Sequence, residues 1–308
     1  MNGAGDARRL YLLPFDDRRT FSIKALGWNG VPSAEQSAQI AAAKQVFYEG
    51  FRAAVATGVP KQKAGLLIDE RFGTAILRDA LARGYTVVYS VERSGQGEFD
   101  FENGKEFARK IETLQPTFCR VLVRYNPRGE RALNQRQVER LSRLSRYLHE
   151  KSRSKFMVEL LVPPEKFQLE QLQGSTKAYE LWLRPRLMVD AIERLQDAGV
   201  EPDVWNIEGL DQPADYQKIV AAARRHGRTN VACIVVAVRE DESTVTKWLT
   251  VAARVPGFIG FAVGHTDFSE ALLSWRDKTM TREEAVAWIA ARYRQFVSMF
   301  ERAEALAV

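Results

Sequence analysis

The chain has 308 residues, of which 45% are hydrophobic and 27% are charged, as in soluble globular proteins. Its net charge is +6, but basic residues are scattered among acidic ones instead of forming a stripe, so we expect no nucleic-acid partner. The longest purely apolar run, residues 231–238, is too short to cross a bilayer, and the N-terminus lacks a signal-peptide pattern, so we expect a cytoplasmic protein without a membrane partner.

Strand-like and helical patterns alternate along the chain after a short N-terminal tail, residues 1–8. The strand-like segments are residues 10–15, 64–68, 86–91, 119–125, 156–162, 204–207, 231–238 and 258–263. The helical patterns are residues 34–57, 74–83, 105–114, 135–150, 180–198, 214–225, 243–254 and 282–305. Repeated strand–helix units predict parallel strands joined by right-handed crossovers. We therefore predict an α/β fold, a (β/α)₈ TIM barrel that forms a single domain over residues 9–308.

An open, doubly wound sheet would show the same alternation of strands and helices. Such a sheet usually carries a glycine-rich phosphate turn after its first strand. Here that turn begins Asp16-Asp17-Arg18, which contains no glycine. The sequence therefore favours the closed barrel.

The two cysteines, Cys119 and Cys233, both lie inside apolar strand-like segments. Neither has CxxC spacing or a histidine nearby, as a zinc site would require. We expect two buried, reduced thiols.

Polar residues follow most of the predicted strands, and in a barrel the carboxyl ends of all strands meet at one mouth. These residues are Asp16, Asp17, Arg18, Asp69, Glu70, Glu92, Arg93, Arg124, Asn126, Glu159, Asn206, Glu208, Arg239 and His265. We expect that solvated loop residues and internal ion pairs account for more than half of this set, because structural networks also collect charges.

The sixth strand places two polar side chains on one face. Because strand side chains alternate, Val204, Asn206 and Glu208 share a face, and Trp205 and Ile207 share the other. We expect Asn206 and Glu208 to point into the barrel near its C-terminal mouth.

Glu159 lies within an otherwise apolar strand, where its carboxylate must be desolvated or paired. Two interpretations remain open: a general acid–base group, or one half of an interior salt bridge to Arg120 or Arg124. Arg120 and Arg124 share a strand face and are expected to point inward, where arginine commonly binds phosphate or carboxylate.

The eighth strand ends in Gly264-His265, just before a short helix near Ser269. Barrel enzymes often bind phosphate on backbone N–H groups at this place. We expect Gly264 and His265 to bind a phosphate.

Seven motifs together resemble one known family. They are Phe15-Asp16-Asp17-Arg18, Ile68-Asp69-Glu70-Arg71-Phe72-Gly73, Val91-Glu92-Arg93-Ser94-Gly95-Gln96, Leu122-Val123-Arg124-Tyr125-Asn126-Pro127, Glu159-Leu160-Leu161-Val162-Pro163-Pro164, Asp197-Ala198-Gly199-Val200-Glu201-Pro202-Asp203 and Gly257-Phe258-Ile259-Gly260-Phe261-Ala262-Val263-Gly264. The family is the aldolase-like domain that follows the sugar kinase in 5-dehydro-2-deoxygluconokinase fusion proteins of inositol catabolism. The chain is also similar, more distantly, to tagatose-1,6-bisphosphate aldolase.

The resemblance implies a barrel of the class I aldolase lineage, which cleaves a phosphorylated keto sugar through a Schiff base on a strand-six lysine. The expected products in inositol catabolism are dihydroxyacetone phosphate and malonic semialdehyde. We expect the catalytic residues to be Asp16, Arg124, Glu159 and Asn206. We expect the substrate-binding residues to be Asp17, Arg18, Asp69, Glu92, Arg120 and Glu208, with Gly264 and His265 at the phosphate.

The chain departs from this pattern at the position of the Schiff-base lysine, which is occupied by Asn206. An amide nitrogen cannot form an iminium and cannot supply that electron sink. Arg93 and Arg120 stand where lysine is expected, and His265 stands where relatives have arginine.

Two functions remain open. In the first, a diverged aldolase uses Asn206 and Arg124 to polarise the substrate carbonyl while Glu159 transfers protons. A metal held by Asp16, Asp69, Glu92, Glu208 and His265 would be a variant of this idea, but no spacing supports it, so we expect neither metal nor cofactor. In the second, the barrel binds a sugar phosphate without turnover. A sugar phosphate is the expected partner in both, and a homo-oligomer remains open.

Overall fold

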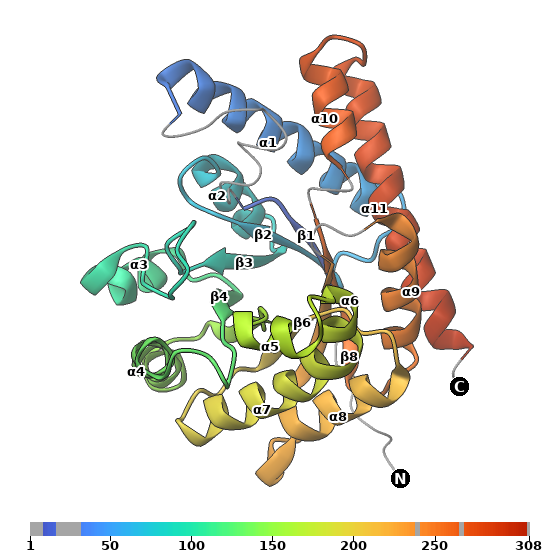
Figure 1. Ribbon diagram of the computed structural model, residues 1–308. Coiled ribbons are helices and arrows are strands. Elements are labelled where there is room, and N and C mark those ends of the chain that lie inside the picture. Colours follow the sequence, from blue (N-terminus) through green and yellow to red (C-terminus); the bar gives the residue numbers. More distant parts are fainter. Residues whose placement is uncertain (1–8, 17–31, 238–240, 265–267, 307–308) are drawn as a thin grey trace, which may run out of the picture.

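Eight parallel strands form a closed barrel in the computed structural model, which describes residues 9–16, 32–237, 241–264 and 268–306 (Figure 1). The strands follow one another around the barrel in chain order, and the first pairs with the eighth. Their bounds are β1 Leu10–Pro14, β2 Ala64–Ile68, β3 Thr86–Ser90, β4 Phe118–Arg124, β5 Lys155–Leu161, β6 Val204–Glu208, β7 Ala232–Ala237 and β8 Phe258–Val263. The predicted TIM barrel is confirmed.

Helices surround the barrel on its outer side (Figure 1). The longer ones are α1 Ala34–Ala56, α2 Thr74–Ala82, α3 Phe107–Leu114, α4 Arg131–Lys151, α7 Arg184–Asp197, α8 Pro213–Ala223, α9 Glu242–Ala253, α10 Ser269–Arg276 and α11 Arg282–Ala305. Shorter helical segments are η2 Gly104–Glu106, α5 Lys166–Gln171, α6 Thr176–Ala178, the π-helical segment η3 Tyr179–Leu183 and η4 Arg225–Gly227. The sequence analysis did not predict α5 or α6, which lie in the long connection between β5 and α7, whereas its helical pattern over residues 180–198 covers most of η3 together with α7.

Helix α1 and helix α11 lie side by side, although they are far apart in the sequence (Figure 1). Each begins with a capping box, in which Ser33 pairs with Gln36 in α1 and Thr281 pairs with Glu284 in α11. A Cβ atom on Gly50 of α1 would lie 2.5 Å from the side chain of Ile289, so the missing side chain permits this close approach. The C-terminal helix thereby packs against the first one.

Two separate apolar layers follow from the alternation of side chains along the strands. One layer lies between strands and helices and includes Trp205 and Ile207 of β6. The other fills the barrel and includes Val204, together with Met157 of β5 and Ile234 of β7. The predicted two faces of the sixth strand are therefore confirmed.

The barrel interior becomes polar toward the carboxyl ends of the strands. Ser90, Arg120, Glu159 and Asn206 point inward there and are buried. In the described residues, no helix combines the length and the apolarity that crossing a membrane requires.

Candidate functional site

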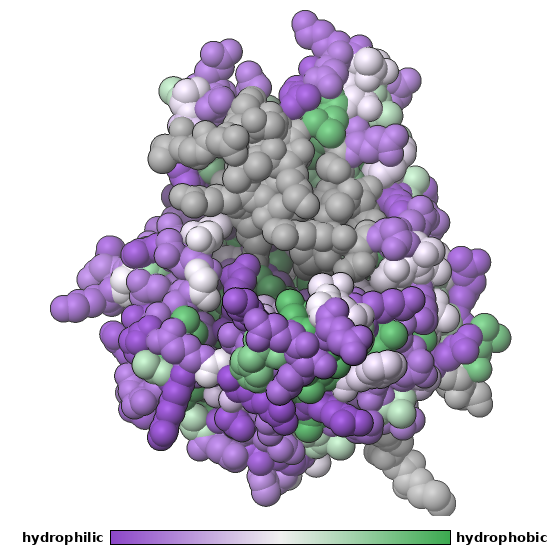
Figure 2. Space-filling view, viewed as in Figure 1, coloured by the Kyte–Doolittle hydropathy of each residue, from purple (hydrophilic) through white to green (hydrophobic). Residues whose placement is uncertain are grey.

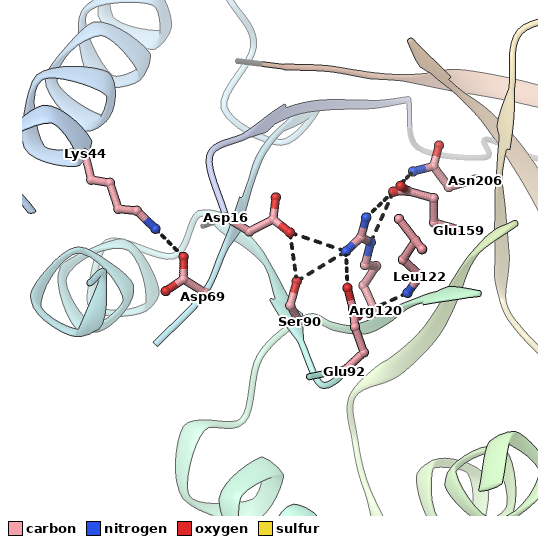
Figure 3. A network of polar contacts seen from close by, with 9 residues as sticks. All are labelled: Asp16, Lys44, Asp69, Ser90, Glu92, Arg120, Leu122, Glu159 and Asn206. Carbon is pink, nitrogen blue, oxygen red and sulfur yellow. Dashed lines mark hydrogen bonds and ion pairs between the residues drawn. The ribbon is translucent and has the colours of Figure 1, made fainter. Parts of the chain in front are cut away.

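Arg120 of β4 is the centre of a polar cluster inside the barrel (Figure 3). Its Nη1 donates to Oε1 of Glu92 at 2.8 Å and to Oδ2 of Asp16 at 3.3 Å. Nη1 also lies 3.4 Å from Oγ of Ser90, the neighbour of Arg120 across the β3–β4 register. Arg120 is 1% exposed, so these contacts are made away from water and are electrostatically strong. A single guanidinium from β4 therefore joins the ends of β1 and β3.

Glu159 of β5 connects the same guanidinium to β6. Its Oε2 accepts from Nε of Arg120 at 3.1 Å and from Nη2 in a shorter contact. The same oxygen accepts from Nδ2 of Asn206 at 2.9 Å, because Asn206 pairs with Glu159 in the β5–β6 register. Of the two salt-bridge partners that the sequence allowed for Glu159, the structure places Arg120 in contact.

Arg124 lies at the exposed end of β4, away from this buried cluster. Its Nη1 donates to the backbone carbonyl of Gln96 at 3.1 Å. The strand alternation placed Arg124 on the same face as Arg120, but the end of the strand leaves the barrel interior, so Arg124 reaches the loop after β3 instead.

Asn206 occupies the position of the expected Schiff-base lysine and is completely buried. Its Nδ2 donates a hydrogen bond to Glu159, whereas its Oδ1 has no hydrogen-bond partner. A buried carbonyl oxygen without a partner costs free energy, on the order of 1–3 kcal/mol. The vacant atom is an acceptor, so it suits a hydroxyl or amine of a ligand.

Glu208 lies two residues beyond Asn206 on the same face of β6, at the mouth. Its Oε2 accepts from the backbone N–H of Val162 at 3.3 Å and lies 3.5 Å from Nη1 of Arg184. Burial raises the pKa of Glu208 above its ordinary value of 4.5, although Arg184 acts in the opposite direction.

Asp69, at the end of β2, forms an ion pair with Lys44 of helix α1 (Figure 3). Lys44 is 1% exposed and lies 5.7 Å from the ring centre of Phe72. The second carboxylate oxygen of Asp69 accepts from the backbone N–H of Phe72 at 3.2 Å. These contacts hold α1 against the loop after β2.

Gly264 follows β8, and a Cβ atom there would lie 2.6 Å from Cγ of Pro14. The close packing of two strand ends therefore requires a glycine at this place. The other predicted phosphate ligand, His265, and the substrate-binding residues Asp17 and Arg18 lie outside the described residues.

The sequence analysis missed three residues at the mouth: Ser90, Arg184 and Lys44. The strand alternation in the sequence could have identified Ser90, because it shares an inward face with Val88 at the end of β3. Arg184 and Lys44 come from helices, and no spacing in the sequence shows which strand end they contact. Among the described residues, no group of three or more His, Cys, Asp or Glu side chains is arranged to hold a metal ion.

Figure 2 shows the same face of the molecule as Figure 1, with hydrophilic residues over most of the coloured surface. Large exposed apolar side chains include Phe167 and Trp182, both on the connection between β5 and α7.

The fold is similar to those of fructose-bisphosphate aldolases of known structure. An archaeal fructose 1,6-bisphosphate aldolase matches with a TM-score of 0.59 and 12% identity over 94% of both chains. The same values hold for an archaeal aldolase whose catalytic lysine is covalently bound to the carbinolamine intermediate of its substrate. The Plasmodium falciparum fructose-bisphosphate aldolase matches with a TM-score of 0.57 and 10% identity over 98% of this chain and 91% of that chain. At these identities the similarity establishes the fold.

No protein of curated function is similar to this chain in sequence. One family model, described as an uncharacterized protein conserved in bacteria (DUF2090), matches residues 6–304. The match covers nearly the whole chain, and the protein therefore belongs to the DUF2090 family.

Proposed function

We propose that the protein is an aldolase-type carbon–carbon lyase that acts on a phosphorylated keto sugar or a keto acid without forming an iminium. The observation that carries the proposal is the buried cluster of Arg120, Glu159 and Asn206 at the mouth of an aldolase-like barrel. Barrel enzymes keep their chemistry at this end, and buried ionic groups without a purely structural need are concentrated at such sites.

Asn206 determines whether the site can form a covalent iminium with a carbonyl substrate. Its nitrogen cannot form an iminium, and it already donates to Glu159. Its vacant Oδ1 accepts a hydrogen bond, which a hydroxyl next to the carbonyl of a keto sugar supplies. We therefore assign Asn206 to the orientation of the substrate and not to covalent catalysis.

The resemblance to inositol-catabolism proteins suggests the reaction partners. Dihydroxyacetone phosphate and malonic semialdehyde would then join in the aldol direction, and their aldol product would be cleaved in the opposite direction. Asp16, Glu92 and Arg120 would set the charge at the inner end of the site, and Gly264 would lie near the phosphate.

A second function is supported by a specific observation. The guanidinium of Arg120 is engaged by three carboxylates of the chain itself, those of Asp16, Glu92 and Glu159. A site in which the central cation is already paired and the lysine is absent suits a barrel that binds a sugar phosphate and regulates without turnover.

The test is aldol synthesis with dihydroxyacetone phosphate and malonic semialdehyde, followed by ³¹P NMR, with further aldehydes as alternative acceptors. Binding of dihydroxyacetone phosphate is measured in parallel by calorimetry. The variant Asn206→Leu, which removes the vacant acceptor and the contact with Glu159, is the matched control.

The proposal predicts a new phosphorus signal that depends on the wild-type protein and is lost with Asn206→Leu. Binding without a new signal would support the regulatory function instead. The absence of both binding and turnover would contradict both functions.

A further inference from the structure

Glu208 is the residue of β6 that lies between the buried cluster of Arg120, Glu159 and Asn206 and the solvent. It lies on the same face as Asn206 and two residues closer to the mouth, a rise of roughly 6–7 Å along a strand. Asn206 is 0% exposed, whereas the side chain of Glu208 is 31% exposed. The carboxylate of Glu208 therefore lies between the buried cluster and the solvent.

The carboxylate of Glu208 is held from two neighbouring segments. The backbone N–H of Val162 donates to it, and the carbonyl of Val162 accepts from the hydroxyl of Tyr179 at 2.8 Å. Arg184 lies beside it and donates from Nη2 to the carbonyl of Gly209 at 3.0 Å. Tyr179 begins the π-helical segment η3, a rare form of helix that occurs frequently at functional sites.

The backbone after Glu208 is equally restrained. A Cβ atom on Gly209 would lie 1.9 Å from the ring of Trp248 in α9, so glycine is required for this packing. The N–H of the next residue, Leu210, donates to the hydroxyl of Tyr216 in α8 at 2.8 Å. Helices α7, α8 and α9 therefore all fix the end of β6, as expected for a preorganised functional group.

Arg184, which lies beside Glu208, carries a buried donor that the described residues leave unsatisfied. Nε of Arg184 has no hydrogen-bond partner, although Arg184 is 94% buried, with 6% of its surface exposed. An unsatisfied donor of this kind is uncommon in native proteins and requires a reason.

The charges around Glu208 favour proton exchange. Burial is the main cause that raises its pKa, and the neighbouring carboxylates of Glu159 and Glu180 raise it further. Arg184 and the N–H of Val162 lower the pKa, but burial is the larger effect. Glu159 is in a different situation, since one of its oxygens already accepts from Arg120 and Asn206.

We propose that Glu208 is the catalytic residue that exchanges a proton with the substrate hydroxyl, a role that rests on the proposed lyase function. In the cleavage direction, the carboxylate of Glu208 takes the proton of the hydroxyl on the carbon that becomes the aldehyde. The O–H electron pair forms the aldehyde carbonyl, the carbon–carbon bond breaks, and its electron pair passes to the keto fragment as an enolate. Glu208 then returns the proton to the enolate carbon, so the step needs no oxidant, reductant or further reactant.

The first measurement is direct titration of the carboxyl group by ¹³C NMR, with ¹³C-labelled glutamate in wild-type protein and in Glu208→Gln. We expect one signal that titrates above the ordinary range of glutamate and is missing in Glu208→Gln. Glu180→Gln, which removes an exposed carboxylate nearby, is the control and should retain that signal. A Glu208 signal with an ordinary pKa would overturn the assignment without the need for any ligand.

The second measurement is the pH profile of aldol cleavage. We expect the rate of the wild-type protein to rise with pH through the pKa of Glu208, because the base must be ionised. Loss of a general base typically costs roughly 10²–10⁴-fold in rate, and Glu208→Gln should show this loss in kcat without the rising limb. An unchanged profile in Glu208→Gln would contradict the proposal.

Calorimetry separates this inference from the proposed function. Dihydroxyacetone phosphate is bound at one pH in buffers of different ionisation enthalpy, which reports the number of protons exchanged with buffer. Proton exchange that is present in wild type and lost in Glu208→Gln supports the role of Glu208. If both proteins bind and exchange the same number of protons with the buffer, that role is overturned and the lyase function stays intact. If the wild-type protein does not bind, the lyase function itself is contradicted.

Discussion

Asn206 donates from Nδ2 to Oε2 of Glu159 at 2.9 Å, and both residues are almost completely buried. The register of β5 and β6 places the two directly opposite each other. The amide at the position of the expected lysine is thus part of the ionic cluster, because it shares an acceptor with Arg120.

Replacement of Asn206 by alanine removes a donor to a buried carboxylate. We expect Asn206→Ala to lower the free energy of unfolding by at most about 1–3 kcal/mol, because Glu159 loses one of its partners while the removal of the unpaired Oδ1 offsets part of that loss. Urea denaturation measures the change. Asn230→Ala, at an exposed position, is the control and should have little effect. An equal loss in both variants would show that the contact contributes nothing specific.

Arg120 is surrounded by the carboxylates of Asp16, Glu92 and Glu159. The variant Arg120→Met should lower the free energy of unfolding by about 3–5 kcal/mol, because it leaves buried carboxylates without their cation. Arg120→Lys should cost less, since it keeps the charge and loses the planar fork. Thermal and urea unfolding compare the two variants, and an equal cost would argue against the ion pairs as the cause.

The raised pKa of Glu208 predicts that the stability of the protein depends on pH. Its pKa is raised in the folded protein, so the folded state binds more protons than the unfolded state over the window between the ordinary value of 4.5 and the raised one. Stability therefore falls as pH rises through that window. The variant Glu208→Gln should not show this fall. Its free energy of unfolding should exceed that of the wild-type protein above the window, and the difference between the two proteins should be smaller below it. Unfolding curves measured across this range check the sign, and a wild-type curve that runs parallel to that of Glu208→Gln would contradict it.

The two thiols should be unreactive in the folded protein. Burial raises the pKa of both Cys119 and Cys233 to about 12, so almost no thiolate is present at neutral pH. Ellman's reagent should label neither thiol in native protein and both in urea. Rapid labelling of native protein would show that β4 or β7 opens to solvent.

The barrel could be predicted from the sequence because its determinants are local. Alternation within β6 correctly predicted the inward position of Asn206, and the apolar surroundings of Glu159 correctly predicted that it needs a partner. The same alternation did not predict the exposure of Arg124, because the loop after β3, which forms a bridge between Glu92 and Phe101, determines what the end of β4 contacts.

Residues that reach the mouth from helices could not be predicted. The contact of Arg184 with Glu208 depends on how α7 packs, and the ion pair of Lys44 with Asp69 depends on how α1 lies against β2. Neither packing arrangement has a signature in residue spacing. Helices α5 and α6, between β5 and α7, were missed for a related reason, since segments of six and three residues are too short for a helical period to show.

The most direct test of the central claim is the intact mass of the protein after incubation with dihydroxyacetone phosphate and borohydride, which reduces any iminium to a stable adduct. The measurement compares wild type with Asn206→Lys, which restores an amine beside Glu159 and Arg120. We predict no mass gain in wild type and a stoichiometric gain in the folded Asn206→Lys variant, located at residue 206. A gain in wild type, or none in folded Asn206→Lys, would contradict the claim that this mouth is an aldolase-type site that works without an iminium.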